Sequence, residues 1–111
     1  MSVKVIAYDV GTTGLKTCLF SISAEESVQY LAGEVEHYAL HVLDNGGVEQ
    51  DAADWWDAMA RSTRRLLERT GTAREEIRGI TFCSQFQTVV LVDQAGRPLR
   101  RAMGCMDARA D

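Results

Sequence analysis

The stretch from residue 3 to residue 22 constrains the fold most, because an apolar run, a glycine turn and a second apolar run follow one another directly. The runs at 3–9 and 15–22 are apolar on both faces, which is typical of strands inside a sheet. We expect these two strands to pair across the turn. Gly11 and Gly14 can adopt positive φ angles, so the turn is either a plain hairpin or a nest of backbone N–H groups that holds an anion.

Polar side chains around this turn are of the types that bind a phosphate and a magnesium ion. Hydroxyl and ammonium groups donate hydrogen bonds to phosphate oxygens, and a carboxylate is a hard oxygen ligand for Mg²⁺. A Walker A loop is excluded, because after Gly11 and four further residues such a loop needs a second glycine before its lysine and helix, and Lys16 stands at that position. The candidate phosphate-binding residues are Gly11, Thr12, Thr13, Gly14 and Lys16, and the candidate metal ligand is Asp9.

Residues 51–70 have the clearest helix pattern in the chain. Asp51 is expected to cap the amino end, and Gly71 is expected to follow the carboxyl end in the left-handed conformation. Apolar residues recur at helical spacing, and we expect this stripe, both tryptophans included, to face the core. The stripe consists of Ala52, Trp55, Trp56, Met59, Ala60, Thr63, Leu66 and Leu67.

Further strands are expected on both sides of this helix. A third strand at 30–43 would end at an Asp-Asn-Gly-Gly turn, and strands at 77–84 and 88–93 would follow the helix. Thr72 and Glu75 have the spacing of a capping box, which predicts one short helical turn before residue 77. Three strands, a helix and more strands together predict an α/β domain with a mixed sheet.

Composition narrows the class of protein. A chain of 111 residues suits one small domain, and no apolar run approaches the roughly 20 residues of a membrane span. The amino end lacks the pattern of a secretion signal, so we expect a cytoplasmic protein without a membrane partner. Residues 61–111 contain 10 basic and 6 acidic residues, but the two kinds are interleaved. This pattern predicts a solvated helix face and no nucleic-acid site.

The cysteines and histidines do not form a recognisable metal or disulfide pattern. Cys18, Cys83 and Cys105 are far apart and contain no Cys-x-x-Cys pair, so buried free thiols are expected. His37 and His41 lie on one face of the expected third strand and have no partner at metal-ligand spacing. They are predicted to be a surface pair.

Segments along nearly the whole chain resemble, in order, the N-terminal part of the FGGY carbohydrate kinases. The strand and turn that end at 9–16 are similar to the family's first phosphate motif. Residues 46–56 resemble its Glu-Gln-Asp segment and the helix that follows, and 80–85 resemble a strand that ends in a substrate-facing glutamine. The hairpin at 89–99 and the segment 106–109 resemble the family's next hairpin and its Trp-x-Asp-x-Arg segment.

This resemblance implies a ribonuclease H-like fold of the actin and hexokinase type, in which two domains close on ATP, Mg²⁺ and a sugar or polyol. Residues 1–111 would be the N-terminal part of the first domain, with the nucleotide-binding domain absent. The implied reaction is transfer of the γ-phosphoryl group of ATP to a hydroxyl. Asp9 would organise the metal through water, and the turn residues would face the terminal phosphates. The substrate-binding residues would be Gln50, Asp51, Gln85, Asp107 and Arg109.

Two consequences concern activity and substrate. In the family the aspartate that acts as general base lies further along the chain, so residues 1–111 alone are expected to be inactive. Cys105 stands where the family commonly has tryptophan, and residues 86–88 replace the Met-His-Gly of xylulokinase-like members. Gln87 is then either a second polar reader of the substrate or a turn residue. Residues 46–51 favour a pentulose kinase over a glycerol kinase.

A second function stays open at this point. The chain could be a stand-alone sugar- or phosphate-binding module, or have a regulatory or assembly role without catalysis. An incomplete sheet would leave a strand edge unpaired, which favours a homodimer through that edge.

Overall fold

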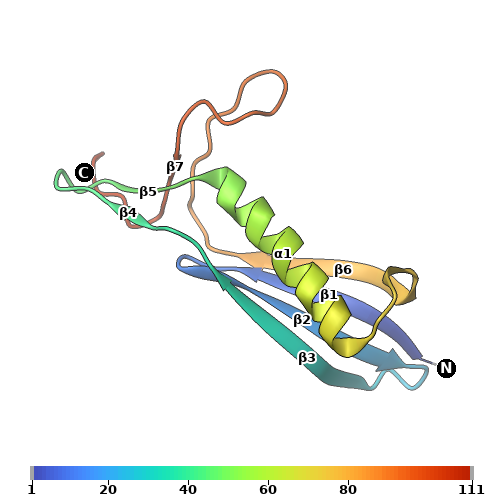
Figure 1. Cartoon of the computed structure of the whole chain (residues 1–111). Helices are drawn as coiled ribbons and strands as arrows, with labels where there is room; N and C mark the ends of the chain where they lie inside the picture. The colour runs from blue at the N-terminus through green and yellow to red at the C-terminus, as the bar shows by residue number, and fades with distance from the viewer. Residues whose placement is uncertain (1, 111) are drawn as a thin grey trace.

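The computed structural model describes residues 2–110, which form a four-stranded sheet, one long helix and a smaller three-stranded sheet (Figure 1). The larger sheet contains β1 (Ser2–Val10), β2 (Gly14–Ser23), β3 (Val28–His37) and β6 (Ile77–Ser84). Its strand order is β3-β2-β1-β6, with β6 parallel to β1 and the other pairs antiparallel. Val10 pairs with Leu15 beside the glycine turn, so the predicted hairpin and the mixed sheet are confirmed.

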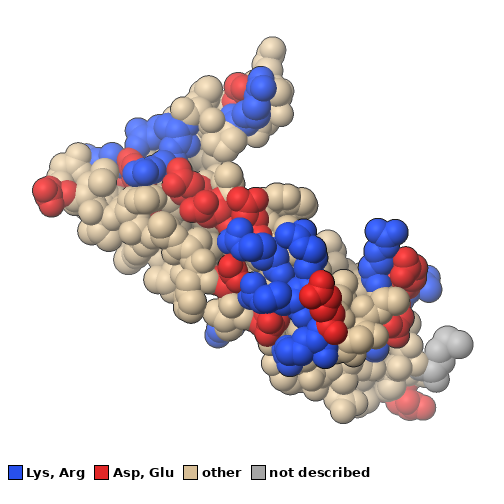
Figure 2. All heavy atoms as spheres, in the orientation of Figure 1, with Lys and Arg blue, Asp and Glu red and all other residues tan. Residues whose placement is uncertain are grey.

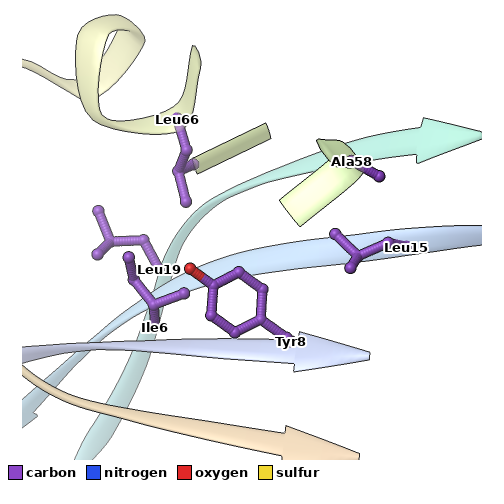
Figure 3. Packing of buried hydrophobic residues seen from close by; sticks show 6 residues of the cluster. All are labelled: Ile6, Tyr8, Leu15, Leu19, Ala58 and Leu66. Atoms are coloured by element: carbon purple, nitrogen blue, oxygen red, sulfur yellow. The ribbon is translucent and has the colours of Figure 1, made fainter. Parts of the chain in front are cut away.

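Helix α1 (Ala52–Thr70) crosses one face of this sheet and closes the core (Figure 3). Side chains of β1 and β2 alternate between the two faces, and those on the α1 side are buried. The core consists of Ile6, Tyr8, Leu15, Leu19, Ala58 and Leu66. The helix ends as predicted, since Gly71 has a φ of 66° and its N–H donates to the Glu68 carbonyl.

The predicted burial of both tryptophans is wrong, because Trp56 is 69% exposed. The helix instead buries Ala58 and Ser62 completely, neither of which belongs to the predicted stripe. Small side chains let the helix approach β2 closely, and a count of large apolar residues does not reveal such positions. The helix therefore lies rotated from the orientation that the stripe predicts.

The predicted strand at 30–43 is also wrong, because it is divided between the two sheets. β3 ends at His37, and the chain continues into β4 (His41–Val42) of the smaller sheet, whose order is β4-β5-β7. The other strands of that sheet are β5 (Val48–Gln50) and β7 (Ala102–Met103). The break falls where the pairing with β2 ends, since His37 is the register partner of Gly14, the first residue of β2. The next residue, Tyr38, donates from its hydroxyl to the Gly14 carbonyl oxygen. The two histidines therefore do not form a pair, and His41 contacts Asp51 instead.

Other local predictions need smaller corrections. The expected strand at 88–93 is reduced to two isolated bridges, between Val89 and Met103 and between Val92 and Pro98. The short turn η1 (Arg74–Glu76) is capped one residue later than predicted, because the Glu76 carboxylate accepts the Ala73 N–H at 2.7 Å. The cysteines are free, but Cys83 and Cys105 are exposed and only Cys18 is partly buried.

Charged side chains gather on the outer face of α1, where blue and red groups alternate in Figure 2. Arg61, Arg65 and Arg69 form ion pairs with Glu34 and Glu36 of the neighbouring β3. These three arginines therefore link the helix to β3. No helix in residues 2–110 has the length and apolar character that crossing a membrane requires.

The outer edge of β6 is open, and Ile80 and Phe82 are each 58% exposed on it. This edge is the feature on which the expected homodimer depends. The dimer itself stays a prediction.

A buried hydrogen bond between hydroxyls joins the helix to the sheet. Thr17 and Ser62 are 0% exposed and lie 2.7 Å apart, Oγ1 to Oγ. Replacing Ser62 with alanine leaves the Thr17 hydroxyl unpaired, so we expect the free energy of unfolding in urea to fall by about 1 to 2 kcal/mol. Adding Thr17→Val removes both polar partners and should restore part of the loss. A double variant less stable than S62A would contradict this account.

Candidate functional site

The glycine turn lies between β1 and β2, but its glycines do not have the expected conformation. The glycines with positive φ among residues 2–110 are Gly46, Gly71 and Gly96, so the argument for a nest from positive φ at Gly11 and Gly14 is wrong. Close approach is the reason for glycine here. A Cβ on Gly14 would lie 2.9 Å from the Glu36 carbonyl oxygen, and one on Gly11 would lie 3.0 Å from the Gly14 carbonyl oxygen.

The carbonyl groups of the turn are held from inside the protein. The Tyr38 hydroxyl donates to the carbonyl oxygens of Gly11 and Gly14, the latter at 3.1 Å. Burial, together with the nearby charge of Asp9, raises the pKa of Tyr38 to about 12, so it remains a donor at neutral pH. Gln50 donates from Nε2 to the Thr12 carbonyl oxygen. These contacts fix the turn without using its threonine hydroxyls.

Asp9 and Lys16 are register partners at the end of the hairpin, and both are exposed. They lie on the sheet face opposite α1, because the adjacent Tyr8 points to the helix and shares a hydrogen bond with Thr63. The nearby Asp9 carboxylate raises the pKa of the Cys83 thiol. Residues 2–110 contain no cluster of three metal-binding side chains. A single exposed carboxylate fits Mg²⁺, which keeps several waters and takes its other ligands from phosphates.

Two glutamines connect this turn to the end of β6. Gln50 is 2% exposed, and its Oε1 accepts a hydrogen bond of 2.8 Å from Nε2 of Gln85. Gln85 Nε2 also lies 3.4 Å from the Gly11 carbonyl oxygen, and the Gln85 backbone N–H donates to Val10. The Thr12 carbonyl thus fixes the Gln50 amide, and Gln50 fixes the Gln85 amide. The side-chain oxygen of Gln85, Oε1, is buried and has no hydrogen-bond partner.

A cavity of about 360 Å³ adjoins Gln85. It is lined by Val10, Trp55, Ser84, Gln85, Gln87, Thr88 and Val90. Gln87, which has a φ of 53°, also borders a second cavity of about 340 Å³ that Cys105 and Asp107 line. The structure therefore brings Gln85 and Gln87 to one cavity. Trp55, which the helix pattern assigned to the core, borders the same cavity.

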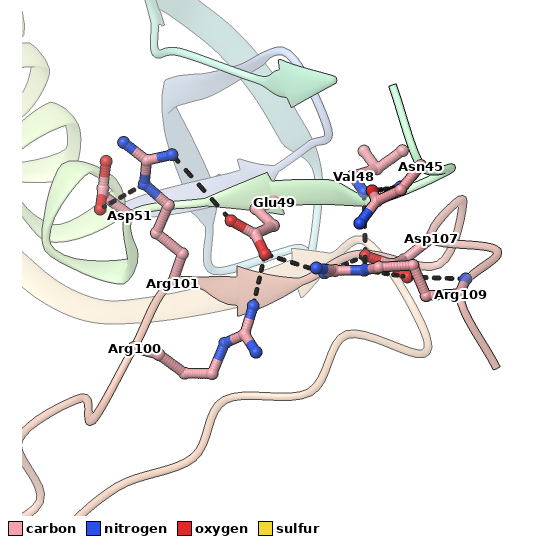
Figure 4. Close-up of polar contacts among 9 residues, drawn as sticks. Asn45, Val48, Glu49, Asp51, Arg100, Arg101, Asp107 and Arg109 are labelled. Carbon is pink, nitrogen blue, oxygen red and sulfur yellow. Dashed lines mark hydrogen bonds and ion pairs between the residues drawn. The ribbon is translucent and has the colours of Figure 1, made fainter. Parts of the chain in front are cut away.

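The remaining predicted substrate residues lie in a network of ion pairs around Glu49 (Figure 4). Arg109 donates to Glu49 at 2.8 Å and to Asp107, and Asp107 accepts the Val48 N–H at 2.9 Å. Asp51 contacts Arg101 at 3.4 Å and His41 at 3.3 Å, and it does not cap α1 with its side chain. Glu49 is 7% exposed and also accepts from Arg100.

Sequence reasoning missed Glu49 as a separate site residue, although it lies in the Glu-Gln-Asp segment. A buried carboxylate needs positively charged partners, and the sequence offers three near its end, Arg100, Arg101 and Arg109. This group of arginines is the signal that could have pointed to Glu49. Each of the residues Asp51, Asp107 and Arg109 has a charged partner within the protein. Their binding of the substrate stays a prediction.

Comparison with known proteins identifies the family of this chain. Residues 4–111 match the N-terminal domain of the FGGY family of carbohydrate kinases. The chain belongs to the FGGY family. A glycerol kinase of Roseobacter denitrificans is 33% identical to this FGGY chain over 106 residues, and a xylulose kinase of Staphylococcus epidermidis is 29% identical over 105 residues. Each alignment covers 95% of the chain and 21% or 20% of the relative.

Solved structures show the same fold for this FGGY chain. A xylulose kinase from Rhodospirillum rubrum matches with a TM-score of 0.75 and 27% identity, over 96% of the chain and 21% of the kinase. A glycerol kinase from Plasmodium falciparum matches with a TM-score of 0.79 at 15% identity, over 96% and 21%. The predicted ribonuclease H-like fold is confirmed. The chain spans about a fifth of the length of these relatives.

The ion pairs of this FGGY chain predict how its stability depends on pH. Arg109, followed by the Val48 N–H, holds the pKa of Asp107 well below its ordinary value. A carboxyl whose pKa falls on folding stabilises the fold above its unfolded pKa, and that contribution is lost as the pH falls through the folded pKa. Asp107→Asn should therefore lower stability at pH 7 and flatten the decline below about pH 4. Urea midpoints from pH 7 to about pH 2 test this, and an unchanged slope would contradict it.

Proposed function

We propose that this chain supplies the sugar-binding and phosphate-facing part of an ATP-dependent carbohydrate kinase, which transfers a phosphoryl group to a sugar or polyol hydroxyl. Family membership and the order of the matching segments support the proposal. The relatives include glycerol and xylulose kinases that match the same share of the chain, and the proposal therefore names the substrate class and not one sugar.

One observation carries the proposal: the Gln85 amide is oriented by Gln50 and presents an unpartnered acceptor beside a cavity. A substrate hydroxyl can donate to this oxygen, and an analogue without the hydroxyl would leave it unpaired. Nε2 of the same Gln85 side chain lies 3.4 Å from the Gly11 carbonyl oxygen, so the amide is held at a set position relative to the glycine turn. Kinase catalysis consists largely of such positioning.

The turn residues and Asp9 would hold the nucleotide side of this site. Thr12, Thr13 and Lys16 would donate to the terminal phosphates of ATP, and Asp9 would orient the water shell of Mg²⁺. When bound, ATP with Mg²⁺ supplies the phosphoryl group and offsets its negative charge. Tyr38 and Gln50 would keep the turn rigid from the other side. We also propose that this kinase acts in the cytoplasm.

We further propose that residues 1–111 bind substrate without turning it over. Within the described chain no carboxylate lines the cavity beside Gln85, so no side chain there could accept the proton of a substrate hydroxyl. The alternative, a regulatory or assembly module without a sugar site, predicts that the chain binds neither a sugar nor ATP·Mg²⁺.

Separate titrations of the purified chain with D-xylulose, glycerol and ATP·Mg²⁺ by calorimetry test the proposal, together with a coupled assay of ADP release. We expect saturable binding of at least one neutral sugar or polyol and no sugar-dependent ADP release. Robust turnover by the chain alone would overturn the proposed inactivity. Absence of binding to both D-xylulose and glycerol would overturn the sugar-binding role, and absence of binding to ATP·Mg²⁺ as well would favour the regulatory or assembly module.

A further inference from the structure

Two buried polar atoms lack a hydrogen-bond partner, and their residues line the same cavity. Among the buried side-chain nitrogen and oxygen atoms of residues 2–110, these are Nε1 of Trp55 and Oε1 of Gln85. Both residues border the cavity of about 360 Å³. Buried polar groups are nearly always paired, so an unpaired donor and an unpaired acceptor at one cavity need an explanation. A ligand that supplies both partners is the simplest.

The two atoms have complementary chemistry that is fixed by the surrounding structure. An indole nitrogen can only donate. The Gln85 amide cannot turn over without loss, because its Nε2 donates to Gln50 Oε1 at 2.8 Å and faces the Gly11 carbonyl. The cavity therefore offers one donor from α1 and one acceptor from the end of β6. A polyol or ketose carries several hydroxyl groups, each of which can donate or accept, so such a ligand can supply a partner to both atoms.

The rest of the cavity wall favours an uncharged ligand. Its other residues are apolar or carry neutral hydroxyl and amide groups, and none of the seven lining residues is charged. A carboxylate or phosphate that entered would lose hydration without gaining a cation. The arginines near this end of the chain are already paired with Glu49, Asp51 and Asp107. A sugar acid would find no free cation in this wall.

We propose that Trp55 is a specificity-determining residue of the sugar site, whose indole N–H donates to a hydroxyl of an uncharged polyol or ketose while Gln85 accepts from a hydroxyl of the same ligand. This assignment rests on the proposed sugar-binding function. Because both atoms are buried in the present structure, the proposed contacts require a small rotation of the Trp55 ring and a small tilt of the Gln85 amide that keeps its bond to Gln50. Phe86, which follows the end of β6, is 69% exposed and is not among the residues that line this cavity.

Two tryptophans on one helix provide a matched pair of variants. Trp55→Phe keeps an aromatic wall and removes only the N–H donor, whereas Trp56→Phe makes the same change at a side chain that is 69% exposed. D-xylulose and D-gluconate serve as probes, one neutral and one with a carboxylate. The W56F chain retains Trp55 as its single tryptophan, so its fluorescence and indole NMR signal report on the cavity alone.

We expect W55F to bind D-xylulose about five- to tenfold more weakly than the wild type, and W56F to bind it equally well. D-gluconate should bind about tenfold or more weakly than D-xylulose. In W56F, D-xylulose should shift the Trp55 indole proton downfield, a readout that does not depend on the fold of W55F.

Equal binding by W55F and wild type, or an indole signal that D-xylulose leaves unmoved, would overturn the role of Trp55 and leave the proposed function intact. Tighter binding of D-gluconate would overturn the preference for an uncharged ligand. If the wild type binds neither D-xylulose nor glycerol, the proposed function fails and this inference fails with it.

Discussion

Replacing Gln85 with leucine is expected to weaken binding of a neutral sugar by about tenfold or more, which corresponds to about 1.4 kcal/mol. The leucine removes the unpartnered acceptor beside the cavity, and it also leaves Gln50 Oε1 without its donor. The buried Gln50 amide should then reorient, and the glycine turn that it holds should become less rigid. Calorimetry with D-xylulose measures the first effect, and hydrogen exchange at residues 11–14 measures the second.

Two further variants separate these effects. Gln85→Glu retains oxygen atoms at the cavity but loses the donors to Gln50 and Gly11, so it should also weaken binding. Gln94→Leu makes the same change as Gln85→Leu on the exposed turn at 93–96 and should bind like the wild type. If Q85L and Q94L bound the sugar equally well, Gln85 would not be part of the site.

Replacing Glu49 with glutamine is expected to lower the free energy of unfolding by about 2 to 3 kcal/mol. Glu49 is 7% exposed and accepts from Arg100 and Arg109, so the neutral amide leaves two guanidinium groups without their buried partner. The arginines can turn toward water, which keeps the loss below the largest values seen for buried ion pairs. The structural change should be greatest at β5 and β7, because Glu49 of β5 pairs with Met103 of β7.

The control for this experiment is Glu75→Gln. Glu75 also pairs with an arginine, Arg74, but both side chains are largely exposed. We expect it to leave the free energy of unfolding nearly unchanged, because water screens an exposed ion pair. Equal effects of E49Q and E75Q in urea unfolding would show that burial of the Glu49 carboxylate contributes nothing.

Much of the fold could be predicted because it depends on local patterns. The β1–β2 hairpin, helix α1 and β6 follow from apolar runs, helical spacing and glycine positions, and the structure confirms them. The break after His37 could not be predicted in this way, since it depends on pairing with Gly14, the first residue of β2, which lies more than twenty residues earlier. Contacts between residues far apart in the chain produce no periodic pattern in the sequence.

The candidate site shows the same division. Residue types and the family resemblance pointed to Gln85 and Gln87, and the structure brings both to one cavity. They could not reveal that Gln50 is buried between Thr12 and Gln85. Helical spacing treated Trp55 and Trp56 alike, but a one-residue step turns a side chain by about 100° around the helix. One tryptophan therefore borders the cavity and the other lies in solvent.

Sugar binding at Gln85, beside the glycine turn, can be measured by NMR titration of the isotope-labelled chain with D-xylulose. We expect saturable shifts of the Gln85 side-chain amide, the Trp55 indole N–H and the backbone of residues 85–88. Signals of the ion-pair network around Glu49 should shift little. Shifts confined to Asp107 and Arg109, or no shifts at the highest sugar concentration, would show that the sugar does not bind at Gln85.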